Sequence, residues 1–264
     1  GHPLNPSAIY NLVKHSCDQT VGIISQCFNA EFIGNLPRGY FDNFLLKVNG
    51  KIGGRNCIVD PAVLKTLPFS LECTMIVGVD VNHPAPTERS VLSVAAAVGS
   101  YDAWFTRYSA SIRAQVRERD EIVKQLDQMI TELLEEYRKI NRCYPDNVIL
   151  FRDGVSDGQF AHVKRIELRL VEAALKTTTG KPIKLTCIVT QKRHHTRFVR
   201  ERMETSGNKS TWNVPSGTVV DTTIVDPQFK MFYLNSHFSP LVRIWILGGR
   251  ESRMILRLLT CILI

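Results

Sequence analysis

Apolar strand-like runs alternate with long amphipathic helices through the middle of this chain, and this alternation limits the fold more than any other feature. The runs at 74–81 (TMIVGVDV) and 148–151 have the short, β-branched character of buried strands. Helices are predicted over about 120–141 and 159–176, where apolar residues return at helical spacing. Strands that alternate with helices in this way indicate an α/β or α+β core.

The sequence around this core predicts further elements. A meander of three strands is expected from 74 to 116, and two late strands follow the basic segment. In the first part, helices are predicted over 5–14 and about 40–52, with a strand over 20–28 between them. The helical spacing predicts these inward-facing residues: Ile9, Leu12, Val13, Phe41, Leu45, Val48, Ile52, Ile122, Leu126, Met129, Leu133, Tyr137, Ile140, Val163, Ile166, Leu170 and Ala174.

Charge and cysteine content narrow the class of protein. The 33 Lys and Arg residues outnumber the 25 Asp and Glu residues, which suits a polyanionic partner, although many ordinary proteins share such a surplus. The seven cysteines are scattered singly without a CxxC pair, which argues against a disulfide framework or a zinc site and favours a reducing compartment. The apolar tail at 241–264 carries four arginines and a glutamate, so it makes a poor membrane span.

Two carboxylates follow buried-type strands, Asp80 after the first and Asp153 after the next strand-like run of the same kind. Strand ends of this kind open onto the functional crevice of α/β sheets. Two acids that meet there repel each other unless a divalent cation such as Mg²⁺ lies between them. A pair of such ions can promote phosphodiester cleavage. The alternative is that each Asp is an ordinary turn residue, particularly in Asp-Gly.

Two further groups of polar residues carry similar alternatives. Glu121 stands where the long helix is predicted to begin, a position that favours acids for reasons of the helix dipole alone. The segment at 191–202 (QKRHHTRFVRER) places Lys192, His195 and Arg197 among other basic residues after a strand, a density of donors suited to phosphate oxygens. A solvated basic loop is the alternative for this segment.

The first 57 residues hold a separate basic group. Tyr10 and Lys14 share one face of the first helix, Lys47 and Lys51 share a face of the second, and Gln26 ends the expected strand. Three ammonium groups with a phenol and an amide are able to enclose a terminal phosphate. Ordinary helices with solvated lysines remain the alternative.

These segments occur together and in order, and the chain resembles the C-terminal part of eukaryotic Argonaute proteins from about residue 8 to 239. The matching blocks are DVNHP, SVAAAVGSYD, FRDGVSDGQF, VTQKRHHTRF, NVPSGTVVDT and FYLNSH. The resemblance implies an α/β architecture, an RNase H-like PIWI fold with a mixed sheet and flanking helices, preceded by part of a Rossmann-like MID domain. The implied parts are 1–57 as the end of MID, 58–73 as a connector, 74–240 as an incomplete PIWI domain and 241–264 as a divergent tail.

The resemblance also implies a function and its residues. The protein is expected to bind a small guide RNA and pair it with target RNA, with silencing partner proteins, in the cytoplasm or also the nucleus, and without a membrane. Asp80, Glu121 and Asp153 match the catalytic acids, and Asp80 and Asp153 would hold Mg²⁺, with Mn²⁺ as the alternative. The guide 5′-phosphate pocket matches Tyr10, Lys14, Gln26, Asn43, Lys47 and Lys51, and the guide-backbone contacts match Lys192, His195 and Arg197.

The chain departs from the family pattern after SHFSPL. The family continues there with a segment that supplies a fourth catalytic residue, usually His, whereas this chain reads VRIWILGGRESRMILRLL, and His237 matches an earlier position. We therefore expect RNA-guided silencing with impaired cleavage. The alternatives are an active Mg²⁺-dependent RNA-guided endoribonuclease and an unrelated basic metal-dependent nuclease.

Overall fold

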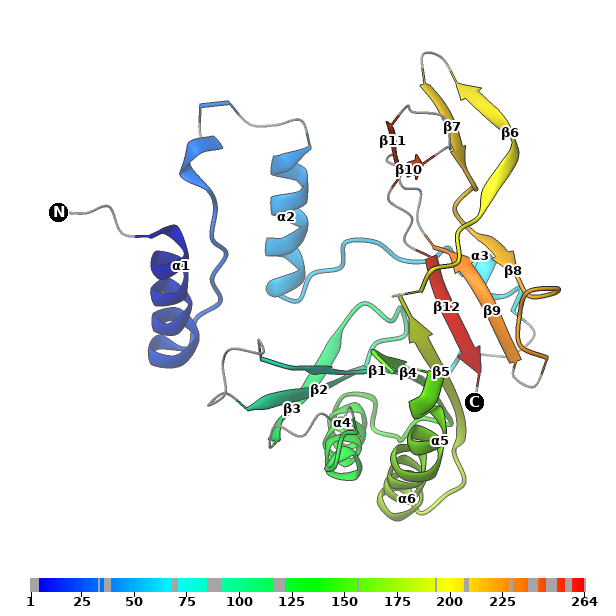
Figure 1. Cartoon of the computed structure of the whole chain (residues 1–264). Helices are drawn as coiled ribbons and strands as arrows, with labels where there is room; N and C mark the ends of the chain where they lie inside the picture. The colour runs from blue at the N-terminus through cyan, green and yellow to red at the C-terminus, as the bar shows by residue number, and fades with distance from the viewer. Residues whose placement is uncertain are drawn as a thin grey trace. The chain divides into compact units, whose positions relative to one another are not determined.

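The protein divides into two compact units, Gly1–Pro68 and Phe69–Ile264, in a computed structural model (Figure 1). We call these the first unit and the second unit. The division falls inside the segment expected as a connector, and the assignment of the two units to named domains stays a prediction. The structure describes residues 5–32, 34–35, 39–67, 71–84, 92–115, 122–155, 157–192, 194–206, 209–227, 230–236, 242–245, 251–254 and 258–263.

The first unit is helical where the structure describes it. The Asn5 side chain caps α1 by accepting a hydrogen bond from the Ser7 amide at 3.0 Å, and Pro6 occupies the first turn, where a missing amide hydrogen costs nothing. Both predicted helices are confirmed. The helical segments are α1 (Pro6–His15), a π-helical turn (Ser16–Val21), a 3₁₀ turn (Ala30–Phe32), α2 (Tyr40–Lys51) and α3 (Pro61–Leu64).

The strand predicted over 20–28 is wrong. Residue 20 lies in the π-helical turn, and residues 22–28 have no regular structure. A strand requires a hydrogen-bonded neighbour, and no strand occurs among the described residues of the first unit. The apolar run there has the composition of a strand without a partner to complete one.

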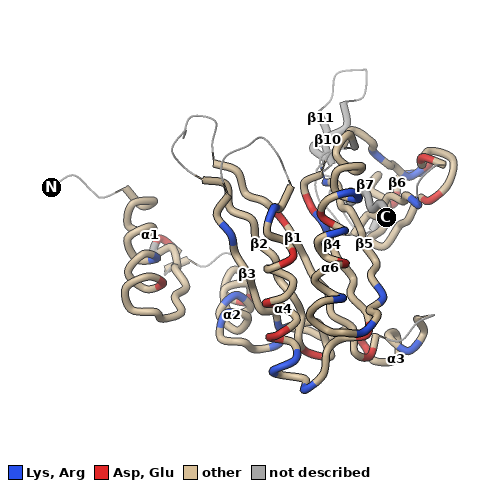
Figure 2. The backbone as a smooth tube through the Cα atoms, turned by 90° about the horizontal axis from the view of Figure 1, so that it is seen from below, with Lys and Arg blue, Asp and Glu red and all other residues tan. Residues whose placement is uncertain are grey.

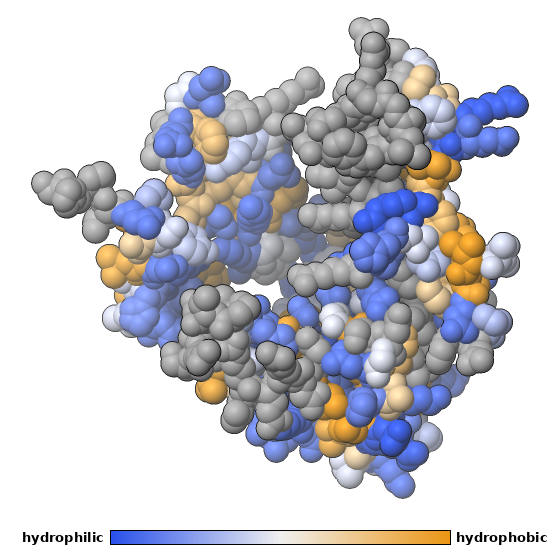
Figure 3. Space-filling model, in the orientation of Figure 1, coloured by the Kyte–Doolittle hydropathy of each residue, from blue (hydrophilic) through white to orange (hydrophobic). Residues whose placement is uncertain are grey.

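The packing face of α2 also differs from the prediction. Phe41, Leu45 and Ile52 are exposed, and so are Ile9, Leu12 and Val13, which were predicted to form the inner side of α1. Figure 3 shows hydrophobic side chains at the surface of the first unit. The aromatic contacts of α2 come instead from Tyr40 and Phe44, whose rings lie 5.6 and 5.5 Å from the ring of Phe28 in edge-on geometry. The extended segment after α1 therefore packs on a neighbouring stripe of α2.

The second unit is built on a mixed eight-stranded sheet in the order β3-β2-β1-β4-β5-β12-β9-β8. The predicted meander forms the antiparallel part, because β2 pairs antiparallel with both β1 and β3. β4 pairs in parallel with β1 and with β5, and these strands run side by side (Figure 2). The strands are β1 (Thr74–Asn82), β2 (Ser93–Ser100), β3 (Tyr108–Gln115), β4 (Asn147–Asp153), β5 (Lys184–Gln191), β8 (Thr218–Val220), β9 (Lys230–Asn235) and β12 (Leu258–Leu263).

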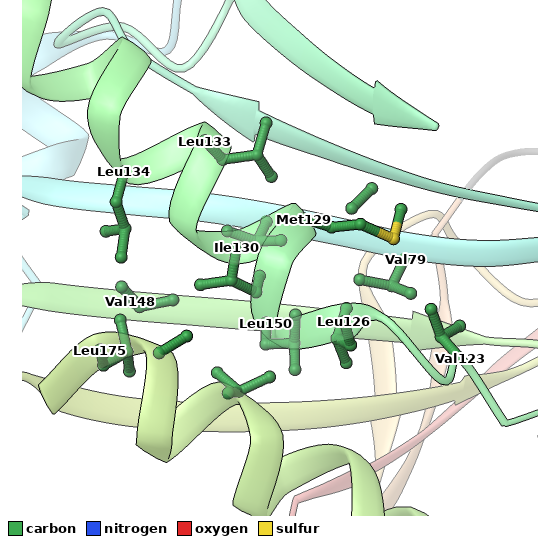
Figure 4. Packing of buried hydrophobic residues seen from close by; sticks show 14 of the residues in the cluster. Val79, Val123, Leu126, Met129, Ile130, Leu133, Leu134, Val148, Leu150 and Leu175 are labelled. Atoms are coloured by element: carbon green, nitrogen blue, oxygen red, sulfur yellow. The ribbon is translucent and has the colours of Figure 1, made fainter. Parts of the chain in front are cut away.

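Helices cover one face of this sheet and bury the main core. α4 (Leu126–Asn141) and α6 (Leu168–Thr179) pack their apolar sides on alternate residues of β1 and β4 (Figure 4). The alternation follows from the pleat of each strand, which sends successive side chains to opposite faces. The core contains Met75, Val77, Val79, Leu126, Met129, Ile130, Leu133, Leu134, Val148, Leu150, Val171 and Leu175, among others.

Two details of the helices correct the sequence prediction. α4 begins at Leu126 rather than near 120, and Ile140 in its last turn is 51 % exposed. The second helix is interrupted by a π-helical segment, Val163–Glu167, between the short α5 (Phe160–His162) and α6. Within this π segment Ile166, which was predicted to face inward, is exposed, and Glu167 is buried.

The tail region forms strands in the residues that the structure describes. β12 lies between β5 and β9 and is antiparallel to both. Two hairpins complete the second unit, β6 (Val199–Ser206) with β7 (Lys209–Asn213) and β10 (Val242–Trp245) with β11 (Glu251–Met254). Within the described part of the chain, no helix is both long and apolar enough to cross a membrane.

Candidate functional sites

Two acids meet at neighbouring strand ends of the second unit. The parallel register of β1 and β4 pairs Val79 with Arg152, so the next residues, Asp80 and Asp153, occupy corresponding positions on adjacent strands, about 4.8 Å apart in backbone spacing. Val79 and Arg152 point into the buried face. Asp80 and Asp153 therefore share the opposite face, away from the helices, and we call them the acid pair.

A positively charged side chain, Lys192, lies at the acid pair. The Lys192 ammonium forms an ion pair with Oδ2 of Asp153, and Lys192 directly follows β5, the strand on the other side of β4. The Oδ1 atoms of Asp80 and Asp153 accept hydrogen bonds from the amides of Val81 and Gly154, each at 2.9 Å. The acid pair thus offers further carboxylate oxygens to a cation, which fits the hard oxygen ligands that Mg²⁺ prefers.

The other predicted members of this site are not all described. Glu121 and His237 lie outside the described residues. Among those that are described, no group of three or more His, Cys, Asp or Glu side chains is placed to hold a metal ion. The structure therefore brings two of the three predicted catalytic acids together.

The basic segment after β5 is partly bound to itself. One guanidinium nitrogen of Arg197 donates to the carbonyl oxygens of His194 and Thr196, each at 2.7 Å. Arg197 and His195 are both exposed, so each is accessible to a ligand. Their contact with an RNA backbone stays a prediction, as does that of Lys192.

Two lysines converge on one backbone oxygen in the first unit. Nζ of Lys14, from α1, donates to the Ser25 carbonyl at 2.7 Å and to Ser25 Oγ at 2.8 Å. Nζ of Lys51, from α2, donates to the same carbonyl at 2.7 Å. Desolvation, followed by the neighbouring Lys14, lowers the pKa of Lys51. We call Lys14 and Lys51 the lysine pair.

The other predicted phosphate ligands lie around the lysine pair on the same elements. Gln26 directly follows Ser25 and donates through Nε2 to the Cys27 carbonyl at 2.9 Å. Tyr10 precedes Lys14 by one helical turn, and Asn43 and Lys47 precede Lys51 by two turns and one turn; all three are exposed. Ser25 was not predicted as part of this site, and no charge or motif in the sequence marks it.

A protein-family model and several known proteins match most of this chain. The family model described as the Piwi domain matches residues 3–240. "Protein argonaute 2" of Oryza sativa subsp. japonica is 42% identical over 234 residues, covering 86% of this chain and 22% of that protein. "Protein argonaute-2" of Drosophila melanogaster is 37% identical over 239 residues, covering 86% of this chain and 18% of that protein. The chain thus spans about a fifth of the length of these relatives.

Structural comparison agrees with the sequence comparison. The crystal structure of Kluyveromyces polysporus Argonaute with a guide RNA superposes with a TM-score of 0.78 at 26% sequence identity, covering 99% of this chain and 29% of that one. The mixed sheet flanked by helices is the predicted RNase H-like architecture, and this prediction is confirmed. The chain belongs to the Piwi domain family, and the relatives that it resembles are Argonaute proteins.

Proposed function

We propose that this chain is part of a small-RNA-guided silencing protein, in which the first unit binds the 5′ phosphate of a guide RNA. The convergence of the lysine pair on the Ser25 carbonyl is the observation that carries the proposal. A similar protein from Kluyveromyces polysporus has been crystallised with a guide RNA. Pairing of the guide with target RNA and recruitment of silencing partner proteins belong to the same proposal.

Electrostatics explains why the lysine pair suits a phosphate. Two ammonium groups that share one neutral acceptor repel each other, which is one cause of the lowered pKa of Lys51. A terminal phosphate carries up to two negative charges and three acceptor oxygens, so it satisfies both ammonium groups at once. Binding of an anion should therefore raise the pKa of Lys51 again.

We propose that the acid pair holds a divalent cation, Mg²⁺ with Mn²⁺ as the alternative, with Glu121 as the third acid. Such an ion supplies activation of water and stabilisation of the leaving oxygen in phosphodiester cleavage. Asp80 and Asp153 supply four carboxylate oxygens at the ends of two adjacent strands, and Lys192 supplies a neighbouring ammonium. Asp80 and Asp153 would bind the cation and fix its position, and Lys192 offsets part of their negative charge.

Repression with little cleavage is the form of silencing that we favour. β12 occupies the place beside β5 in the sheet, and its sequence, LLTCIL, contains neither an imidazole nor a carboxylate to act as a fourth ligand. An active RNA-guided endoribonuclease is the second candidate, supported by the register that brings Asp80 and Asp153 together. We propose a reducing compartment, the cytoplasm or also the nucleus, which suits the singly scattered cysteines of the sequence.

The lysine pair predicts selectivity for the 5′ end of a guide RNA. The whole chain should bind a 5′-phosphorylated single-stranded RNA about 10-fold or more tightly than the same RNA with a 5′ hydroxyl, because each charge-assisted hydrogen bond contributes about 1.5–3 kcal/mol. Fluorescence polarisation with an internal label measures both affinities. A 5′-hydroxyl RNA with a 3′ phosphate is the control for total charge, and equal affinity for all three RNAs would favour an unrelated basic nuclease.

Removal of the Lys192 charge is expected to strengthen the binding of a divalent cation at the acid pair by a small factor. Its ammonium competes with a divalent cation for Asp153, so Lys192→Gln should tighten Mn²⁺ binding up to about five-fold at low ionic strength, the range expected of an exposed ion pair. Titration of Mn²⁺ followed by electron paramagnetic resonance measures this change. Lys181→Gln, which breaks a comparable pair with Asp146, is the control. Weaker Mn²⁺ binding in Lys192→Gln would contradict the prediction.

A further inference from the structure

A buried ion pair lies directly behind the acid pair. Arg152 and Glu167 are each 0 % exposed, and they are among the largest fully buried side chains among the described residues. Removing two charges from water costs several kcal/mol per ion, which mutual attraction repays only when the geometry is excellent. A pair of this kind therefore needs an explanation beyond ordinary core packing.

Both carboxylate oxygens of Glu167 accept hydrogen bonds. Nε of Arg152 donates to Oε2 of Glu167 at 2.8 Å, and Nη2 donates to Oε1 at 3.1 Å, so the pair is bidentate. Oε1 of Glu167 also accepts a hydrogen bond from the Val123 amide at 2.9 Å. Nη1 of Arg152 donates to the carbonyl oxygen of Asp153. Glu167 thus links three segments, one of which ends in Asp153.

The π-helical segment places Glu167 in this position. Glu167 is the last residue of Val163–Glu167, and it is buried while its neighbour Ile166 is exposed. The stripe predicted from the sequence places the apolar Ile166 inside instead. π turns are rare and occur frequently at functional sites. The chain thus departs from regular helix geometry at the residue that holds Arg152.

We propose that Glu167 is a positioning residue for the acid pair. It fixes the guanidinium of Arg152, which holds the Asp153 carbonyl, and so sets the end of β4 and the direction of the Asp153 carboxylate relative to Asp80. The inference rests on the proposed function of the acid pair as a divalent-cation site. Outer residues that orient metal ligands typically change metal affinity or activity by 10–100-fold when they are replaced.

The competing explanation is that the pair only stabilises the fold, and a neutral replacement separates the two. Glu167→Gln alone leaves the Arg152 charge buried without its counter-ion. The double variant Arg152→Met/Glu167→Gln removes both charges and keeps an amide oxygen for the Val123 amide. Replacing a buried ion pair by uncharged residues of similar volume is often neutral for stability. The double variant should therefore fold while it lacks the contact to Asp153.

The experiment measures Mn²⁺ affinity by electron paramagnetic resonance in the whole chain, beside unfolding in urea. The affinity should fall about 10–100-fold in both Glu167→Gln and the double variant, although the double variant unfolds near the wild-type midpoint. Val171→Ala is the matched control, since Val171 is buried one turn further along α6 and outside the network. It should lower the unfolding midpoint and leave Mn²⁺ affinity unchanged.

Two results would overturn the inference in different ways. Wild-type Mn²⁺ affinity in the folded double variant would show that the pair serves stability alone, and the acid pair would remain a metal site. If Asp153→Ala leaves Mn²⁺ binding unchanged, or the wild type binds no Mn²⁺, the acid pair is not a metal site. The proposed role of Glu167 would then fall with it.

Discussion

Replacement of both lysines of the lysine pair by methionine will weaken binding of a 5′-phosphorylated RNA by about 100-fold or more. Each ammonium contributes at least one charge-assisted hydrogen bond, worth about 1.5–3 kcal/mol, and methionine retains most of the aliphatic stem. Binding of the 5′-hydroxyl RNA should fall far less, because a contact specific to phosphate contributes little to a hydroxyl end. Fluorescence polarisation with both RNAs, for Lys14→Met/Lys51→Met and the wild type, measures the two changes.

The control must match the loss of two positive charges. Lys65→Met/Lys139→Met removes the same charge from two exposed positions, one in each unit, that take no part in the proposed pocket. It should weaken both RNAs equally and only slightly, through the general electrostatic attraction of a basic protein for RNA. An equal loss for the phosphorylated and the hydroxyl RNA in Lys14→Met/Lys51→Met would contradict a 5′-phosphate pocket.

Truncation of Leu133 will lower the free energy of unfolding of the second unit by about 2–5 kcal/mol. Leu133 is 1 % exposed on the face of α4 that covers the sheet (Figure 4). α4 approaches β2 closely there, since a side chain built on Gly99 would place its Cβ 3.3 Å from Cβ of Leu133. A helix held so close to the sheet has little freedom to fill the cavity that Leu133→Ala leaves.

Tryptophan fluorescence during urea unfolding isolates the second unit, because all three tryptophans, Trp104, Trp212 and Trp245, belong to it. Ile140→Ala is the matched control on the same helix, where the side chain is 51 % exposed, and it should change the midpoint little. Similar losses in the two variants would show that α4 does not pack on the sheet as described.

The alternation of strands and helices was sufficient to predict an α/β or α+β core for the second unit, and the family resemblance added the expectation of a mixed sheet. Periodicity found β1, β4 and α4 because each buries a continuous apolar face whose spacing is visible in the sequence. It failed for residues 20–28, because a strand also depends on a partner that no local pattern specifies. It failed again at Ile166, because the buried position belongs to the charged Glu167, whose burial depends on Arg152 as a partner that no local pattern specifies.

Prediction of the sites had the same limits. Asp80 and Asp153 were recognised because carboxylates at strand ends stand out, and their adjacency then followed from the register of β1 and β4. Lys14 and Lys51 were recognised as charges on helix faces. Ser25 contributes a backbone carbonyl, which every residue possesses, so its part in the site has no signal in the sequence. Glu167 was not predicted as part of any site, because its partner Arg152 lies on a different element.

The place of β12 in the sheet has a consequence for how this protein is made. Within the described strands, β8 and β9 join the main sheet only through β12, which lies between β9 and β5. A nascent chain on the ribosome must therefore keep the edges of β5 and β9 open until residue 263 has left the exit tunnel. Open strand edges recruit other chains, so a molecular chaperone that binds extended segments would have its longest opportunity at this stage of synthesis.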